Sequence, residues 1–121
     1  MLTMAPEPVR MELLRESKEL DVEFENGETY TLPHEFLRVY SPSAEVRGHA
    51  PSEYTLQVGK RHVAIDRIEP QGNYAVQIHF DDGHSTGIYT WEWLYRLCTE
   101  QESMWQAYLQ QLADEGKSRD P

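Results

Sequence analysis

Residues 72–97, GNYAVQIHFDDGHSTGIYTWEWLYRL, carry the clearest structural signals of the sequence. Its first part alternates apolar and polar residues, which is the period of a strand with one buried face; the apolar members are Tyr74, Val76, Ile78 and Phe80. Asp-Asp-Gly at residues 81–83 then provides a turn, because aspartate bonds its own backbone and glycine accepts positive φ. A second strand returns through Thr86, Ile88 and Tyr89. The stretch therefore predicts an antiparallel hairpin.

Two helices are predicted after this hairpin. Thr90 is a suitable N-cap for the first helix, which runs through Cys98. The second helix spans about residues 100–115 and ends at Gly116, a favourable residue after a helix C-terminus. Its apolar residues lie on one stripe: Met104, Trp105, Tyr108, Leu109 and Leu112. We expect this stripe to pack on the sheet; a dimer or partner surface is the alternative.

An earlier hairpin is predicted near the start of the chain. Two runs of alternating apolar residues indicate strands: Val9, Met11 and Leu13, then Leu20, Val22 and Phe24. Asn26-Gly27 predicts a type I′ turn, in which both central residues need positive φ, so residues 20–25 should pair with residues 28–32. Pro33 then ends the second strand and opens a short helix.

The region between the two hairpins is less regular. Residues 41–52, SPSAEVRGHAPS, are rich in turn formers and predict a loop. Alternating apolar residues then predict two strands joined by a turn at residues 59–60: Tyr54, Leu56 and Val58, followed by Val63, Ile65 and Ile68.

The predicted fold class is therefore α+β and mainly β. Small antiparallel sheets are built from hairpins, with a short helix after the first hairpin and one or two C-terminal helices. The main domain spans residues 9–98, and a C-terminal helix follows at residues 99–116. Residues 1–8 are expected to form a disordered lead, and residues 117–121 a disordered tail.

Charge and composition exclude several classes of function. The 121 residues include 11 Lys and Arg against 21 Asp and Glu, and the formal charge of -10 repels nucleic-acid phosphates and anionic lipid. No run of apolar residues is long enough to span a membrane, and the first residues lack the pattern of a secretory signal. Cys98 is the single cysteine, which fits a reducing compartment. We expect a cytoplasmic protein in which Cys98 is a small buried hydrophobe rather than a reactive thiol.

No familiar catalytic template is present. The sequence has no glycine-rich phosphate loop, no GxSxG elbow and no HExxH helix. The residues with metal-like character are His49 and, in HFDDGH, His79, Asp81, Asp82 and His84. Imidazole and carboxylate groups can hold Zn, Mn or Fe, but Asp-Asp-Gly is also ordinary turn chemistry, which we favour. We expect no metal; if one binds, His84 with His49 or Asp82 would hold it.

Two segments resemble a known family: EFLRVYSPSAEVRGH at residues 35–49 and the opening stretch at residues 72–97. They are similar to a small bacterial domain of unknown function that resembles the N-terminal domain of gamma-butyrobetaine hydroxylase, over about residues 9–97. The resemblance implies a compact, mainly β domain with a few helices. In the hydroxylases this domain precedes a catalytic jelly roll with an iron and 2-oxoglutarate site, and it contributes to dimer contacts. That catalytic part is not recognisable here, so the resemblance implies no hydroxylase activity.

The resemblance also bears on zinc. The hydroxylase domain holds a structural zinc with three cysteines and one histidine, and the matching positions here are Ser41, Ser43, Val46 and His84. Because serine is a poor zinc ligand and valine is none, we expect no zinc and no other cofactor. His84 would instead hydrogen-bond the serine-containing loop. Similar domains are appended to ATPases that carry iron–sulfur clusters, which suggests an adaptor role by analogy.

Three functions remain open at this point. The first is a non-catalytic interaction or adaptor domain, in an iron–sulfur or oxygenase system, that binds a protein partner as a monomer or weak homodimer. Its binding surface would comprise Ser41, Ser43, Glu45, Arg47, His49, Asp81, Asp82, His84 and Trp91. The second is a metal-binding protein that uses His84 and nearby His or Asp residues. The third is a small enzyme with His49 or His84 as general base.

Overall fold

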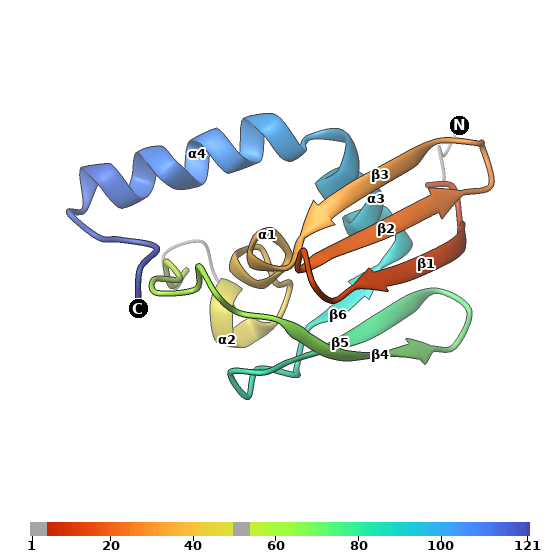
Figure 1. Ribbon diagram of the computed structural model, residues 1–121, viewed down its shortest axis with the longest axis horizontal. Helices are drawn as coiled ribbons and strands as arrows, with labels where there is room; N and C mark the ends of the chain where they lie inside the picture. The colour runs from red at the N-terminus through yellow and green to blue at the C-terminus, as the bar shows by residue number, and fades with distance from the viewer. Residues whose placement is uncertain (1–4, 50–53) are drawn as a thin grey trace.

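A computed structural model describes residues 5–49 and 54–121, and it confirms the predicted α+β class. Two antiparallel sheets lie side by side, and helices cover one end of them (Figure 1). The first sheet has the order β1-β2-β3, with bounds Pro8–Leu14, Glu19–Phe24 and Thr29–Pro33. The second has the order β4-β5-β6, with bounds Ile65–Gln71, Ala75–Phe80 and Ile88–Thr90. Both predicted hairpins are present.

The turn of the first hairpin differs from the prediction. β2 and β3 pair as expected, with Val22 opposite Tyr30. Gly27 has φ of 87°, but Asn26 is not in the left-handed region, so the type I′ turn is wrong. The Gly27 amide donates to the Phe24 carbonyl at 2.9 Å, which is the pattern of a longer loop closed by a glycine bulge. Asn26 instead uses its side chain, whose Oδ1 accepts from the Glu28 amide.

Two short helices follow the first sheet. α1 (His34–Val39) begins after Pro33, as predicted. α2 (Ala44–Arg47) lies inside the segment predicted as a loop, because Ser43 caps it by accepting from the Glu45 amide at 3.1 Å. The end of that predicted loop, residues 50–52, lies outside the described residues.

The predicted strand at residues 54–58 is wrong. This segment is irregular and belongs to neither sheet. Its polar backbone groups find other partners: the Thr55 amide donates to the Val46 carbonyl, and the Tyr108 hydroxyl donates to the Gln57 carbonyl at 2.7 Å. Alternation alone therefore did not decide its structure, because a strand also needs a neighbouring strand.

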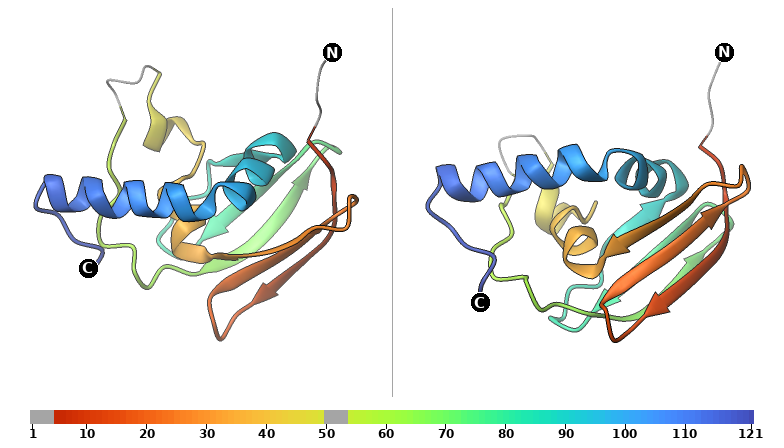
Figure 2. Two further views of the ribbon diagram at one scale, coloured as in Figure 1. Left: turned by 90° about the horizontal axis from the view of Figure 1, so that it is seen from above. Right: turned by 45° about the horizontal axis from the view of Figure 1, so that its top comes forward.

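The two C-terminal helices are confirmed as α3 (Trp91–Thr99) and α4 (Gln101–Asp114). Thr90 caps α3 by accepting from the Trp93 amide at 3.2 Å. The apolar stripe of α4 does not simply pack on the sheet. Met104 and Trp105 reach the main core, whereas Tyr108 and Leu112 bury Val39 of α1. Figure 2 shows α4 extending past the sheets on the side of α1.

The C-terminal tail is more ordered than predicted. Residues 117–121 run back along residues 59–61, where the Gly59 amide donates to the Ser118 carbonyl and the Arg61 amide to the Arg119 carbonyl. Arg119 forms a bidentate pair with the buried Glu35, at 2.6 and 2.8 Å. A buried carboxylate needs such a cation, which explains why this tail is held. Residues 1–4 of the predicted lead lie outside the described residues.

The main core lies between the two sheets and against α1 and α3. Its fully buried members come from both sheets, α1 and α3, and they include Leu20, Val22, Leu32, Leu37, Ile65, Ile78, Tyr89, Leu94 and Leu97. Cys98 joins this core, and burial raises the pKa of its thiol to about 12. The prediction of a buried cysteine is confirmed, and a raised pKa favours the less reactive thiol form. In the described part of the chain, no helix has the length and apolar character needed to cross a membrane.

Candidate functional site

The loop after α1 and the turn between β5 and β6 meet through their polar side chains. Ser41 Oγ lies 2.8 Å from His84 Nε2, and Glu45 Oε2 lies 3.0 Å from His84 Nδ1. Beside them, the hydroxyls of Ser43 and Thr86 are 2.5 Å apart. We call these five residues the Ser41–His84 cluster. The prediction that His84 bonds the serine-containing loop is confirmed.

The protonation of His84 follows from its surroundings. Burial lowers the pKa of His84, and the nearby Arg38 guanidinium lowers it further, against the opposing effect of Glu45. The imidazole is therefore neutral at neutral pH, with one donor and one acceptor nitrogen. Since an ionised carboxylate only accepts, Nδ1–H donates to Glu45 and Nε2 accepts the Ser41 hydroxyl proton.

This connectivity is that of a Ser-His-acid triad, but the serine is inaccessible. Ser41 has no exposed surface, and His84 is 5% exposed. A Cβ added at Gly87 would lie 2.5 Å from Ser41 Oγ, so the backbone of the turn between β5 and β6 covers the hydroxyl. The Ser43 amide donates to the same oxygen at 3.2 Å. A triad nucleophile must be open to its substrate, and Ser41 is not.

The cluster also tests the zinc site that the resemblance implies. Ser41, Ser43, Val46 and His84 are all buried, with Ser41 directly bonded to His84. Two hydroxyls and a valine do not supply thiolate ligands, and both nitrogens of His84 are already hydrogen-bonded. These residues therefore do not fit zinc. Among the described residues, no group of three or more His, Cys, Asp and Glu side chains is placed to hold a metal ion.

The two aspartates of the turn have structural partners. Asp81 Oδ1 accepts from the Ala64 amide at 3.1 Å and so joins the turn to the segment before β4. Asp82 accepts from Lys60 at 2.6 Å and from Arg38 at 2.9 Å. Burial would raise the pKa of Asp82, but the bonds from Lys60, the His84 amide and Arg38 together lower it to about 2. With its carboxylate between two cations, Asp82 is not placed to share a metal with the His84 ring.

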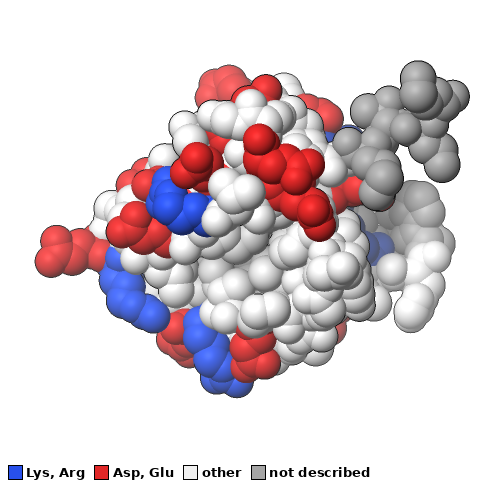
Figure 3. All heavy atoms as spheres, turned by 90° about the vertical axis from the view of Figure 1, so that its right-hand side faces the viewer, with Lys and Arg blue, Asp and Glu red and all other residues white. Residues whose placement is uncertain are grey.

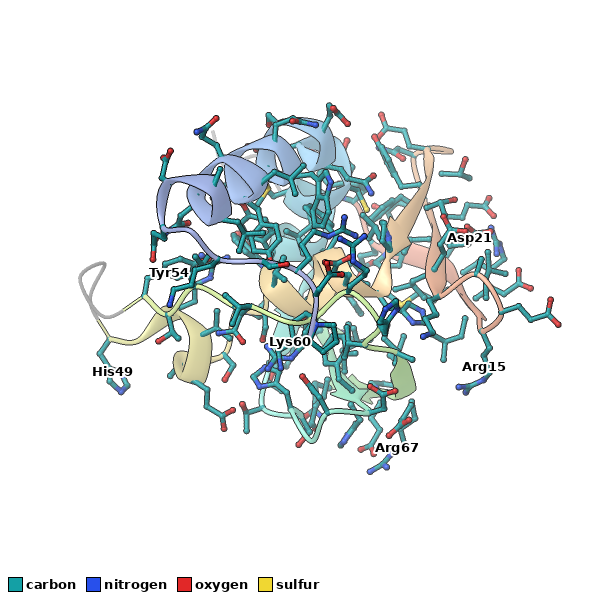
Figure 4. All side chains as sticks on the ribbon, turned by 60° about the vertical axis from the view of Figure 1, so that its left-hand side comes forward. Arg15, Asp21, His49, Tyr54, Lys60 and Arg67 are labelled. Atoms are coloured by element: carbon teal, nitrogen blue, oxygen red, sulfur yellow. The ribbon has the colours of Figure 1, made fainter. Side chains whose placement is uncertain are left out.

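The structure does not gather the other predicted binding residues here. His49 is exposed, and its side chain points away from the body of the domain (Figure 4). The Arg47 guanidinium instead lies over three aromatic rings, at 5.0 Å from Trp93, 5.4 Å from Tyr40 and 5.5 Å from Tyr54. Such cation–π contacts fasten α2 to the domain.

Trp91 lies at the opposite end of the second sheet. Its indole nitrogen donates to the Asn73 carbonyl at 2.8 Å, in the turn between β4 and β5. It lines a groove of about 520 Å³ together with residues that the sequence analysis did not predict to bind a partner: Ala5, Glu7, Glu25, Asn73, Tyr74, Thr90 and Glu92. On this face, Asp and Glu side chains gather above an uncharged area (Figure 3). Alternation had assigned Tyr74 to the buried face of a strand, but it precedes β5 and is 56% exposed.

Solved structures of similar chains share this fold. One NMR solution structure has 46% identity and a TM-score of 0.84, covering 98% of this chain and 93% of the other. A second has 44% identity and a TM-score of 0.84, covering 100% and 92%. A crystal structure of a protein of unknown function of the DUF971 family, from Acidithiobacillus ferrooxidans ATCC 23270, has 41% identity and a TM-score of 0.64, covering 75% and 91%. No match is found among curated proteins.

A family model described as "Gamma-butyrobetaine hydroxylase-like, N-terminal" matches residues 11–95, which is more than half of the chain. The matched residues include both sheets, the Ser41–His84 cluster and most of α3. The resemblance seen in residues 35–49 and 72–97 is thereby confirmed. The chain belongs to the family of gamma-butyrobetaine hydroxylase-like N-terminal domains.

Proposed function

We propose that this chain is a non-catalytic binding domain that recognises a protein partner in the cytoplasm. The observation that supports this most is the complete burial of Ser41 within the Ser41–His84 cluster. The groups with catalytic chemistry bond to one another and hold two loops together. Buried polar groups whose hydrogen bonds are all made within the protein stabilise the fold, and they are not free to react with a substrate.

The two alternatives have weaker support. A metal-binding protein would need ligand atoms that point into a common space, but both nitrogens of His84 are bonded and Asp82 faces Arg38 and Lys60. A small enzyme with His84 as general base would need the Nε2 atom of His84 to reach a substrate, but Ser41 covers this atom. The family resemblance to domains that accompany oxygenases and iron–sulfur ATPases favours a partner in one of those systems.

Site-specific photo-crosslinking of the full chain in cells tests the proposal. A photoreactive phenylalanine analogue replaces one exposed residue at a time, on different faces of the domain: Val9, Val58, Tyr74 and Glu102. We expect one contiguous face to crosslink reproducibly to the same protein. A chain that crosslinks to no protein from any position would contradict the proposal.

A second arm addresses catalysis. The purified chain is incubated with a metabolite extract and followed by NMR, with Ser41→Ala as the comparison. We expect neither protein to consume a metabolite and both to keep the same crosslinked partner. Consumption of a compound by the native chain but not by Ser41→Ala would show an enzyme instead.

A further inference from the structure

We propose that the groove around Tyr74 and Trp91 binds a segment of the partner protein that carries several lysines or arginines. This inference rests on the proposed function and names the chemistry of the partner. We call the site the acidic groove and define it by Glu7, Glu25, Tyr74, Trp91 and Glu92.

The acidic groove lies where both sheets end. Glu7 precedes β1 and Glu25 follows β2, while Tyr74 lies between β4 and β5. Trp91 and Glu92 begin α3. The Glu25 amide donates to the Glu7 carbonyl at 2.9 Å, so the two carboxylate-bearing segments are joined. The volume of about 520 Å³ lies in the range of ligand sites.

The charges of the acidic groove are not balanced by any cation of the described residues. Among the described residues, Glu7, Glu25 and Glu92 form no ion pair, and neither Lys nor Arg lines the groove. Other carboxylates do find cations, such as Glu35 with Arg119. Like charges around one groove repel each other, and a cationic partner relieves that repulsion.

The aromatic walls are held in place before any partner arrives. The Trp91 amide donates to the Tyr74 carbonyl at 3.1 Å, and its indole nitrogen donates to Asn73. The Tyr74 ring stands over Gly72, where an added Cβ would lie 3.0 Å from the ring. Aromatic faces attract ammonium and guanidinium groups, and walls that are already ordered lower the entropy cost of binding.

A protein segment fits better than a single small cation. The three carboxylates come from three separate parts of the chain around the groove. Several cations on one chain can approach them together, while the apolar stems of lysine or arginine cover Tyr74 and Trp91. Such a pairing also gives the fast, salt-dependent association expected of a strongly acidic protein.

NMR titration of the full chain with defined peptides tests the inference. The probes are a short glycine–serine peptide with several arginines and the same peptide with glutamines, at about 100 mM salt to screen distant charges. We expect the arginine peptide to shift the Trp91 indole and Tyr74 amide resonances, and the glutamine peptide to leave them unchanged. Absence of these shifts with the arginine peptide would overturn the inference.

Matched variants separate the acidic groove from overall charge. Glu25→Gln/Glu92→Gln should weaken arginine-peptide binding about tenfold, because two of the three carboxylates that attract the peptide lose their charge. Glu16→Gln/Glu102→Gln changes the net charge equally at distant exposed sites and should keep the affinity. Equal losses in both variants would show general attraction to an acidic protein and overturn the inference.

Two further outcomes complete the test. Spermidine should bind more weakly than the arginine peptide, and equal affinity would overturn the choice of a protein segment. A partner that crosslinks from Val58 or Glu102 but not from Tyr74, together with unshifted Trp91 resonances, would overturn the acidic groove and leave the proposed function intact. Failure of crosslinking from every position would contradict the proposed function itself.

Discussion

The two ends of the second sheet use polar residues in opposite ways. At one end, the Ser41–His84 cluster buries its hydroxyls and imidazole and satisfies them within the protein. At the other end, the acidic groove exposes three carboxylates that have no cation among the described residues. The residues that look most catalytic in the sequence are therefore buried and bonded to one another, whereas exposed glutamates surround the groove that we propose for binding. Burial and partners, rather than residue type, separate the two roles.

Removal of His84 should have the largest effect on stability. His84→Ala should lower the free energy of unfolding by about 3 kcal/mol, because it leaves a cavity and removes the acceptor of the buried Ser41 hydroxyl proton. Urea unfolding measures this change. Glu45→Ala is the control: its side chain is 61% exposed, so its loss should cost less than about 1 kcal/mol. Equal costs for the two variants would mean that the cluster does not hold the loops together.

A side chain at residue 87 should have the next largest effect. Gly87→Ala should cost about 2 kcal/mol, because its Cβ would press on Ser41 Oγ and the Tyr89 ring. In a Ser41→Gly background the same change should cost less, since one of the clashing atoms is gone. Thermal unfolding of the four chains of this double-mutant cycle measures the coupling. Full additivity would show that Ser41 and Gly87 do not meet.

Mild acid should lower the stability of the fold through two buried histidines, His84 and His34. His34 Nε2 donates to the Glu19 carbonyl and Nδ1 accepts from the Ile65 amide, both at 3.1 Å, so this ring joins the two sheets as a neutral group. Burial is the main cause that lowers the pKa of His34, as for His84. The unfolded chain therefore takes up protons first as the pH falls. Stability should be full above about pH 6.5 and decline below it, until the lowered folded pKa values are reached.

Urea unfolding at several pH values measures this dependence. His34→Gln should be less stable at neutral pH but should show a weaker pH dependence, because one of the two titrating groups is absent. His62→Gln, at an exposed position, should keep the pH profile of the native chain. If the stability of the native chain stays constant as the pH is lowered below about 6.5, the two histidine rings are not both neutral and hydrogen-bonded in the folded protein.

The acidic groove should show the smallest effect on stability. Glu25→Gln/Glu92→Gln should change the free energy of unfolding by less than about 0.5 kcal/mol, because these exposed carboxylates form no ion pair with any described residue. The same denaturant experiment measures it, with His84→Ala as the sensitive reference. A loss above about 1 kcal/mol would assign these glutamates to the fold and remove the contrast between the two ends.

Local signals in the sequence were sufficient for most elements of the fold. Alternating apolar residues identified both hairpins, Thr90 identified the start of α3, and Gly116 identified the end of α4. Each of these signals depends on contacts within a few residues, such as a cap bond or the period of side chains along the backbone. The pairing of His84 with the serine-containing loop was also predicted, through the family resemblance.

Contacts between distant segments decided the rest. Arg119 helps to order the tail because Glu35, far away in the chain, is buried beside it. Residues 54–58 alternate like a strand, yet they pair with no strand among the described residues. The acidic groove is assembled from both sheets and α3, so neither its carboxylates nor Tyr74 carries a local signal. Short-range hydrogen bonds and periodicity were enough to predict most of the helices and strands, but not the irregular segment at residues 54–58 or α2. Which polar groups are buried with partners, and which stay open to a ligand, depends on contacts between distant segments that no local pattern encodes.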